Sequence, residues 1–322
     1  MPDAISQVLD AIPGPMLWGL VAVGVMLMLG TMAAVALPFF QPTKDWTNLR
    51  LRVWSWWVMI AMVIAALFAG TTATTVLFAV ISFLALREFL SLASTRREDR
   101  LIVLFAYLSV PICYWLVGTD QYQIYLVAIP VWFFILTPFL MALGGQTRGY
   151  LASVATFNWG VVACVYTLGY VPLLMHVPTS EVPAAGAAGL VFFLLVATQL
   201  NDVLQYCCGK LVGRHKIMPT VSPNKTWEGF FGGWILTGAA IWFMAPLFTP
   251  IDANGRWMLA LLLPLAGFAG DVTMSAVKRD LGVKDTSALI PGHGGVLDRL
   301  DSLTFTAPLY FHLLAYYGLD KY

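Results

Sequence analysis

Apolar residues run along this chain in ten long stretches that are separated by short polar segments. The stretches cover residues 16–40, 53–70, 72–94, 101–118, 123–144, 151–175, 187–207, 229–249, 257–278 and 300–317. A helix needs about 20 apolar residues to cross the hydrocarbon core of a membrane, and these stretches have about that length. The pattern predicts an all-α fold, a polytopic transmembrane helical bundle of about ten spans, with nine also compatible with it.

Composition supports a membrane protein. Of the 322 residues, 59% are apolar and only 11% are charged, whereas soluble chains carry about 45–50% apolar and about 25% charged residues. Such a chain has too few polar side chains to cover a surface that faces water. A soluble enzyme, a disordered chain and a secreted disulfide scaffold are therefore excluded. The first stretch is too long for a cleavable signal and is interpreted as a retained helix.

The basic residues predict the orientation of the spans. Of the 18 Lys and Arg residues, all but Arg256 and Lys321 lie in or beside the odd-numbered connections between the stretches. Lys and Arg are retained on the cytoplasmic side of short loops. We therefore expect the odd-numbered connections to face the cytosol and both termini to face away from it. The net charge of +1 gives no indication of a nucleic-acid partner.

Two carboxylates interrupt the apolar stretches in the last part of the chain. Asp202 and Asp271 each follow a run of apolar and small residues. A carboxylate inside a span is costly unless it is paired, so it is a functional-site candidate by default. Two other interpretations stay open: a carboxylate near a helix end that pairs with a neighbouring Lys or Arg, or an ion site of a transporter.

The stretch Ser275–Asp301 concentrates charges of both signs with glycines in a chain that is otherwise poor in charge. Its charged residues and its histidine are Lys278, Arg279, Asp280, Lys284, Asp285, His293, Asp298, Arg299 and Asp301. Carboxylate oxygens suit Mg²⁺, and cations suit phosphate. The backbone of Gly292, Gly294 and Gly295 can approach an anion closely. The combination favours phosphoryl or nucleotidyl transfer. The alternative is a solvated loop that follows the positive-inside rule.

A second polar segment, residues 222–229, precedes the eighth apolar stretch. It offers the hydroxyls of Ser222 and Thr226 and the cation of Lys225 ahead of a helix N-terminus, which favours an anion site. The segment does not match the P-loop pattern. Ser222 or Thr226 could instead only cap the helix. The Gly229 and Gly233 pair is more typical of helix packing than of function.

The Ser275–Asp301 stretch closely resembles the signature of the phosphatidate cytidylyltransferase (CDP-diacylglycerol synthase) family. That signature reads Ser-x-apolar-Lys-Arg, four residues, Lys-Asp, and then Pro-x-His-Gly-Gly-apolar-x-Asp-Arg-apolar-Asp. Every fixed position is present, from Ser275 to Asp301. Residues 222–229 and the pair Asn201-Asp202 also resemble upstream motifs of this family. The resemblance covers roughly the last 40% of the chain.

The resemblance implies the synthesis of a CDP-lipid and pyrophosphate from CTP and phosphatidic acid, with Mg²⁺ as the cofactor and a second cation as an open option. The implied metal ligands are Asp271 and Asp298. Implied substrate contacts are Ser222, Pro223, Lys225, Thr226, Lys284 and Asp202. The implied catalytic residues are Lys225, Lys278, Arg279, Asp285, His293 and Arg299, with Asp301 on a further signature position. For His293, a loop-structural role is an equal alternative.

The implied organisation is one membrane domain in which residues 1–180 form a scaffold with lipid access and residues 181–322 form the catalytic region. The expected location is the bacterial inner membrane with the active site on the cytosolic face, and a homodimer is plausible by resemblance. Two rivals stay open. One is an ion-coupled transporter that uses Asp202 and Asp271, and the other is a catalytically inactive relative that serves as an assembly partner.

Overall fold

The computed structural model describes residues 12–43, 45–93, 96–145, 147–178, 180–182 and 184–319, apart from the side chain of Arg97. Within these ranges, nine helical segments are long and apolar enough to cross a membrane. They are Gly14–Phe40 (α2), Thr47–Ala69 (α3), Thr71–Leu92 (α4), Arg100–Gly118 (α5), Tyr122–Leu143 (α6, η2 and α7), Tyr150–His176 (α8, η3, α9 and η4), Gly186–Val212 (α10), Trp227–Phe248 (α11) and Ala253–Asp280 (α12). The chain is an integral membrane protein with an all-α helical bundle.

Two of these segments are not regular helices. The fifth contains the π-helical turn Ala128–Phe133 (η2) between Tyr122–Val127 (α6) and Phe134–Leu143 (α7). The sixth contains the π-helical turn Val162–Tyr166 (η3) between Tyr150–Val161 (α8) and Thr167–Leu173 (α9), and it ends in the 3₁₀ turn Leu174–His176 (η4). A further 3₁₀ turn, Arg97–Asp99 (η1), precedes α5. Hydropathy cannot reveal such turns, because they leave the apolar composition unchanged.

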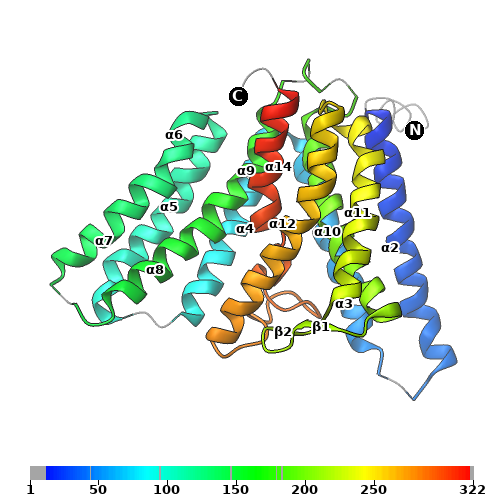
Figure 1. Cartoon of the computed structure of the whole chain (residues 1–322), viewed down its shortest axis with the longest axis horizontal. Coiled ribbons are helices and arrows are strands. Elements are labelled where there is room, and N and C mark those ends of the chain that lie inside the picture. Colours follow the sequence, from blue (N-terminus) through cyan, green and yellow to red (C-terminus); the bar gives the residue numbers. More distant parts are fainter. Residues whose placement is uncertain are drawn as a thin grey trace.

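The tenth expected stretch, residues 300–317, differs from the prediction. The structure has a four-residue helix, Leu297–Leu300 (α13), then a turn, and then Leu303–Gly318 (α14) with 16 residues. At 1.5 Å per residue, α14 is only about 24 Å long, less than the hydrocarbon core. It runs beside α12 and begins part-way along the bundle (Figure 1). The turn before it therefore lies inside the bundle rather than at its end.

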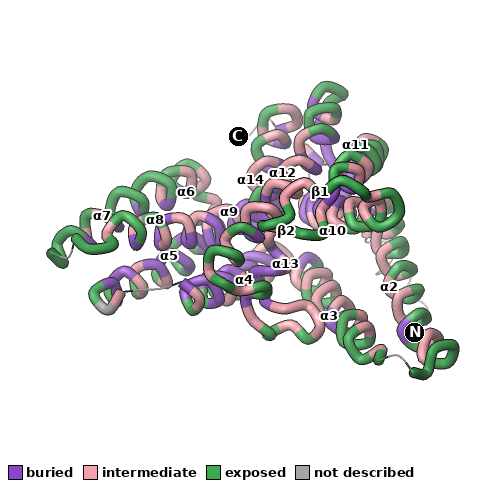
Figure 2. Tube along the Cα trace, turned by 60° about the horizontal axis from the view of Figure 1, so that its bottom comes forward, coloured by how far each residue is buried: buried purple, intermediate pink, exposed green. Residues whose placement is uncertain are grey.

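The helices form two groups that meet through a shared core. Helices α5 to α8 stand on one side of Figure 1, and α2, α10 and α11 stand on the other, with α12 and α14 between them. Contacts of α14 with α9 and of α13 with α4 connect the groups. Buried residues gather around α4, α9 and α13, whereas α2 exposes most of its surface (Figure 2).

Two short strands interrupt the last third of the chain. Lys216–Met218 (β1) pairs antiparallel with Ser222–Thr226 (β2), with Lys216 opposite Thr226 and Met218 opposite Ser222. The second polar segment is thus mostly a strand of a hairpin rather than a loop. Thr226 then caps α11, because its hydroxyl accepts a hydrogen bond from the backbone N–H of Gly229 at 3.2 Å. The capping alternative for Thr226 is confirmed.

The described ends of the chain lie at the same end of the bundle. The start of α2 and the end of α14 are both at the end opposite the β1–β2 hairpin (Figure 1). After the nine candidate spans, α14 runs back to this end of the bundle. Lys44, Lys321 and the outermost residues of both termini lie outside the described residues.

Candidate functional site

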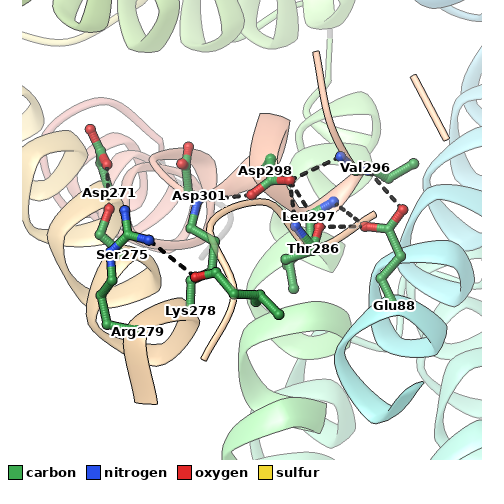
Figure 3. Close-up of polar contacts among 12 residues, drawn as sticks. Glu88, Asp271, Ser275, Lys278, Arg279, Thr286, Val296, Leu297, Asp298 and Asp301 are labelled. Carbon is green, nitrogen blue, oxygen red and sulfur yellow. Dashed lines mark hydrogen bonds and ion pairs between the residues drawn. The ribbon is translucent and has the colours of Figure 1, made fainter. Parts of the chain in front are cut away.

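The expected site residues come from separate elements that meet toward the hairpin end of the bundle. Asp202 lies on α10, Lys225 on β2, and Asp271 on α12. The remaining signature residues follow on the last turns of α12, the segment 281–296, α13 and the turn before α14. Figure 3 shows four carboxylates in a row, in the order Asp271, Asp301, Asp298 and Glu88. The fold thus brings together residues that lie up to about 200 positions apart.

A lysine binds the first expected metal ligand. The Lys225 Nζ atom is 2.6 Å from Asp271 Oδ2 and 4.6 Å from the centre of the Phe268 ring. Ser275, one helical turn after Asp271, donates from its hydroxyl to Oδ1 at 3.2 Å. The Lys225 side chain of β2 therefore points to α12, and both oxygens of Asp271 have a hydrogen-bond donor. The side chains of Lys225 and Asp271 stay 17% and 29% exposed, so solutes can reach them.

The second expected metal ligand, Asp298, is almost fully enclosed. Its side chain is 2% exposed, and Lys278 Nζ lies 2.8 Å from Oδ1. Oδ2 accepts hydrogen bonds from the backbone N–H and the hydroxyl of Thr286 and from the backbone N–H of Gly295. Burial raises the pKa of Asp298, but Lys278 and these backbone donors outweigh burial and hold it below its ordinary value. Asp298 is therefore an ionised carboxylate at neutral pH.

Two further carboxylates lie beside Asp271. The Ser302 hydroxyl donates to Asp202 Oδ1 at 3.0 Å, and the Ser302 N–H donates to Asp301 Oδ1 at 2.9 Å. Asp202, Asp271 and Asp301 are close enough for their charges to act on one another. A Cβ atom on Gly270 would lie 2.4 Å from the Asp301 carbonyl oxygen, so only glycine lets this turn pack on α12.

These carboxylates lie well inside the bundle. Asp202 precedes the end of α10 at Val212 by ten residues, and Asp271 precedes the end of α12 at Asp280 by nine. At 1.5 Å per residue, both lie about 15 Å from the helix ends. The site is therefore a polar region between helices rather than an exposed loop, and this region is called the recess below.

The donor set suits a hard cation such as Mg²⁺, which proteins bind through one or two carboxylates together with substrate phosphates. No group of three or more His, Cys, Asp or Glu side chains in the described ranges is arranged to hold a metal without further ligands. Asp298 has four donors on its two oxygens, whereas Asp301 has one donor on Oδ1. Both oxygens of Asp271 also have a donor. The assignments of Asp271 and Asp298 as metal ligands therefore stay predictions, and Asp301 beside them is a further candidate.

Arg279 shapes the rim of the site through backbone contacts. Its Nε donates to the Val221 carbonyl at 3.3 Å and its Nη1 to the Val283 carbonyl at 3.1 Å. These bonds tie the β1–β2 hairpin to the end of α12. Lys284 and Asp285 are exposed, and the described structure gives their side chains no hydrogen bond or ion pair.

His293 and Arg299 each keep a buried polar atom without a hydrogen-bond partner among the described residues, Nδ1 and Nε respectively. Buried polar groups are usually satisfied, so such atoms mark positions where a ligand can bind. The His293 ring packs edge-on against Trp56 at 5.7 Å. Burial, and then Arg299 and Arg52, lower the pKa of His293, so the imidazole is neutral at pH 7.

The other residues of the second polar segment are either at the surface or in helix packing. Ser222 opens β2 and is partly exposed, and Pro223 is exposed. Gly229 and Gly233 pack α11 against α10, because a Cβ on Gly233 would lie 2.7 Å from the Gln205 backbone. The packing interpretation of this glycine pair is confirmed.

Glu88 is a residue of the site that no sequence motif indicated, although a carboxylate in the third apolar stretch was itself a signal. Glu88 lies on α4, is 6% exposed, and accepts four hydrogen bonds from the signature segment. Arg52 and Ser55 of α3 also bind this segment, at the carbonyl oxygens of Gly292 and Pro291. No motif pointed to these two residues.

Comparison with known proteins identifies the family. The model of the cytidylyltransferase family matches residues 50–317. The uncharacterized protein YnbB of Escherichia coli K12 is 38% identical over 291 residues, which are 90% of this chain and 95% of that protein. The phosphatidate cytidylyltransferase of Mycobacterium leprae is 39% identical over 174 residues, 52% of this chain and 55% of that protein.

The phosphatidate cytidylyltransferase of Staphylococcus epidermidis RP62A is 43% identical over 122 residues, which are 37% of this chain and 46% of that protein. The alignments with the two phosphatidate cytidylyltransferases thus span about half of those proteins. The family model reaches further, from α3 to the end of α14, and so includes every residue of the site described above. The chain belongs to the cytidylyltransferase family and is a nucleotidyltransferase enzyme.

Proposed function

We propose that this protein transfers the cytidylyl group of CTP to a lipid phosphate, phosphatidic acid, and so forms CDP-diacylglycerol and pyrophosphate. The observation that supports this most is the pairing of two lysines with two signature carboxylates. Lys225 binds Asp271 and Lys278 binds Asp298, from a hairpin strand, a membrane helix and a short helix that the fold brings to one recess. The names of the two partial relatives support the choice of lipid acceptor.

The reaction needs little general acid or general base catalysis. A phosphate monoester has its second pKa near 6, so most of the lipid phosphate is a dianion at pH 7. One of its oxygens attacks the α-phosphorus of CTP. The new P–O bond forms as the bond from that phosphorus to the bridging oxygen of the β-phosphate breaks, and pyrophosphate leaves with the electron pair. The neutral imidazole of His293 is consistent with a hydrogen-bonding role rather than with a general acid.

The protein must bring two polyanions together, and its cations can do so. Lys225, in the more exposed of the two pairs, is positioned to exchange part of its contact with Asp271 for phosphate oxygens. Arg299 offers a buried guanidinium nitrogen without a partner among the described residues. Such fixed charges stabilise the charge that develops in the transition state and need little reorganisation.

Mg²⁺, the proposed cofactor, would be held by Asp271 with Asp298 or Asp301, and would supply charge neutralisation for the phosphates of CTP. The depth of the recess suits an acceptor whose acyl chains stay in the bilayer. We also propose that the hairpin end of the bundle faces the cytosol of a bacterial inner membrane, because the basic residues gather there and CTP is cytosolic.

The transporter alternative finds no support. Asp271 is bound by Lys225 and Ser275, and Asp202 by Ser302. Transporter ion sites instead use broken helices in paired repeats. The family is also one of cytidylyltransferases.

The test is turnover by the purified full-length protein in lipid vesicles with labelled CTP, phosphatidic acid and Mg²⁺. We expect equal amounts of labelled lipid and pyrophosphate, and no product when Mg²⁺ is chelated. Asp271→Asn should lower kcat by at least 100-fold, because it weakens both the ion pair and the proposed metal site.

Asp252→Asn is the matched control. Asp252 caps the other end of α12 by accepting a hydrogen bond from the Gly255 N–H at 2.7 Å, and asparagine caps about equally well. This variant should keep wild-type activity. Full activity of Asp271→Asn, or turnover without a lipid phosphate, would contradict the proposal.

A further inference from the structure

Glu88 is a carboxylate of the scaffold region that the proposed reaction does not use. It lies on α4, whose other residues apart from Arg87 are uncharged, and its side chain is buried. Burying a carboxylate without hydrogen bonds is expensive. The hydrogen-bond donors around Glu88 therefore indicate its role.

Both oxygens of Glu88 are fully used by the signature segment. Oε1 accepts from the Ser287 hydroxyl at 2.7 Å and from the Val296 N–H at 3.0 Å. Oε2 accepts from the Thr286 hydroxyl and from the Leu297 N–H, both at 2.9 Å. Four donors on two oxygens suit an ionised carboxylate. Two donors precede the Pro291–Gly295 turn and two follow it, so one side chain holds both ends of the segment 286–297. Figure 3 shows Glu88 against Thr286, Val296 and Leu297.

Thr286 connects this clamp to the proposed catalytic residues. Its hydroxyl lies 2.9 Å from Glu88 Oε2 and 3.0 Å from Asp298 Oδ2, and its N–H donates to the same oxygen of Asp298 at 2.8 Å. A hydroxyl has one proton, so the two carboxylates share it. The position of Asp298 is therefore coupled to that of Glu88 through one threonine.

Gly295 shows how closely the parts fit. A Cβ atom at this position would lie 2.1 Å from Thr286 Oγ1 and 2.4 Å from Glu88 Oε2. The glycine of the signature is thus required because the carboxylate of α4 occupies the adjacent space. This observation is independent of the hydrogen bonds, since it follows from packing alone.

We propose that Glu88 is a positioning residue: it fixes the segment 286–297 so that Asp298 and Arg299 are held in the geometry that cytidylyl transfer requires. The inference rests on the proposed function for its effect on rate, and on the hydrogen bonds alone for its effect on the segment. Glu88 acts through the segment, since both of its oxygens are bound by it.

The experiment compares Glu88→Gln with Glu88→Asp in the full-length protein. Glutamine keeps the shape but turns one acceptor into an NH₂ donor that faces two existing donors. Aspartate keeps the charge but is one methylene shorter. Glu98→Gln, at an exposed glutamate of η1, is the matched control. Each variant is measured for hydrogen–deuterium exchange of the segment 284–300 and for kcat and KM per folded molecule.

For Glu88→Gln we expect exchange of the Val296 or the Leu297 amide, whichever then faces the new NH₂ group, to accelerate at least tenfold, because that amide loses its acceptor. We expect kcat to fall at least tenfold while KM for CTP changes less than threefold, since the lost interaction acts on the transition state. Glu88→Asp should recover part of kcat, and Glu98→Gln should match the wild type. If Glu88→Gln does not fold, Thr286→Val replaces it, with Thr286→Ser as its control and a smaller loss of kcat expected.

Wild-type exchange and wild-type kcat per folded molecule in Glu88→Gln would overturn the inference, even if less folded protein were recovered. The two proposals can fail separately. If the wild type makes no CDP-lipid but the exchange of Val296 or Leu297 responds to Glu88→Gln, the proposed function fails and the positioning of the segment stands.

Discussion

The two lysine–carboxylate pairs of this recess differ in how deeply they are buried. Lys278 and Asp298 are 12% and 2% exposed, whereas Lys225 and Asp271 are 17% and 29% exposed. Removing one partner of a buried pair leaves an uncompensated charge and costs about 3–5 kcal/mol, whereas exposed pairs contribute about 1 kcal/mol or less. The first pair is therefore expected to stabilise the fold, and the second to remain available to ligands.

Substitution by methionine separates the two roles. Lys278→Met should lower the unfolding midpoint in detergent strongly, because Asp298 stays buried with hydrogen bonds only on Oδ2. Lys225→Met should leave the midpoint within a few degrees but reduce CDP-lipid formation at least tenfold. Equal destabilisation by the two substitutions would show that burial does not distinguish the pairs.

Individual residues show how far the sequence could lead. The types and spacing in Ser275–Asp301 pointed to phosphate chemistry, because alternating carboxylates, cations and glycines are needed for it. The pairing of Lys225 with Asp271 could not be read from the chain, since 46 positions separate them and the hairpin decides their meeting. Glu88 was visible as a charge in an apolar stretch, but its partners lie about 200 positions away.

At the scale of elements, the contact between α10 and α11 places the recess. Gln205 of α10 lies against Gly233 of α11 and donates from Nε2 to Asn201 Oδ1 at 3.0 Å. Asn201 in turn donates to the Pro264 carbonyl of α12 at 3.2 Å. The glycine surface of α11 thus supports a hydrogen-bonded chain that passes through Asn201, the sequence neighbour of Asp202, and ends at Pro264 of α12.

We expect Gly233→Ala to push α11 away from α10, because the new Cβ would meet the Gln205 backbone at 2.7 Å and could not be relieved by a side-chain rotation. Both the unfolding midpoint and the activity should fall. Gly24→Ala on α2, where no atom lies within 4 Å of the added Cβ, serves as the control and should be neutral. An unaffected Gly233→Ala variant would mean that this helix contact tolerates separation.

The elements themselves were mostly predictable. Span length and hydropathy located nine of the expected segments, because lipid demands long apolar helices with internal hydrogen bonds. The β1–β2 hairpin was missed because three to five residues give no periodic signal. The turn Asp301–Ser302 was missed because its polar groups are satisfied by α10 and by its own backbone, which only the three-dimensional arrangement shows.

For the whole molecule, the described ends of α2 and α14 lie opposite the hairpin. The distribution of basic residues favours the proposed cytosolic location of the hairpin end. Both statements together predict which connections are accessible from each side of the membrane.

Cysteine labelling tests this topology. In a variant without Cys113, Cys164, Cys207 and Cys208, a single cysteine replaces either Gln121, between α5 and α6, or Gln41, between α2 and α3; both positions are exposed. In intact cells stripped of the outer membrane, a membrane-impermeant maleimide should label Gln121→Cys and reach Gln41→Cys only after lysis. The reverse pattern would invert the proposed orientation.

The contacts of α3 and α4 with the signature segment limit how this protein can be recombined with its relatives. A hybrid that joins residues 1–180 of one family member to residues 181–322 of another would contain every signature residue, yet its catalytic segment would rest on a foreign carboxylate or on none. Hybrids should function only where the donor of the first half supplies a glutamate at the place of Glu88. The two halves are thus expected to be inherited as a matched pair rather than as exchangeable parts.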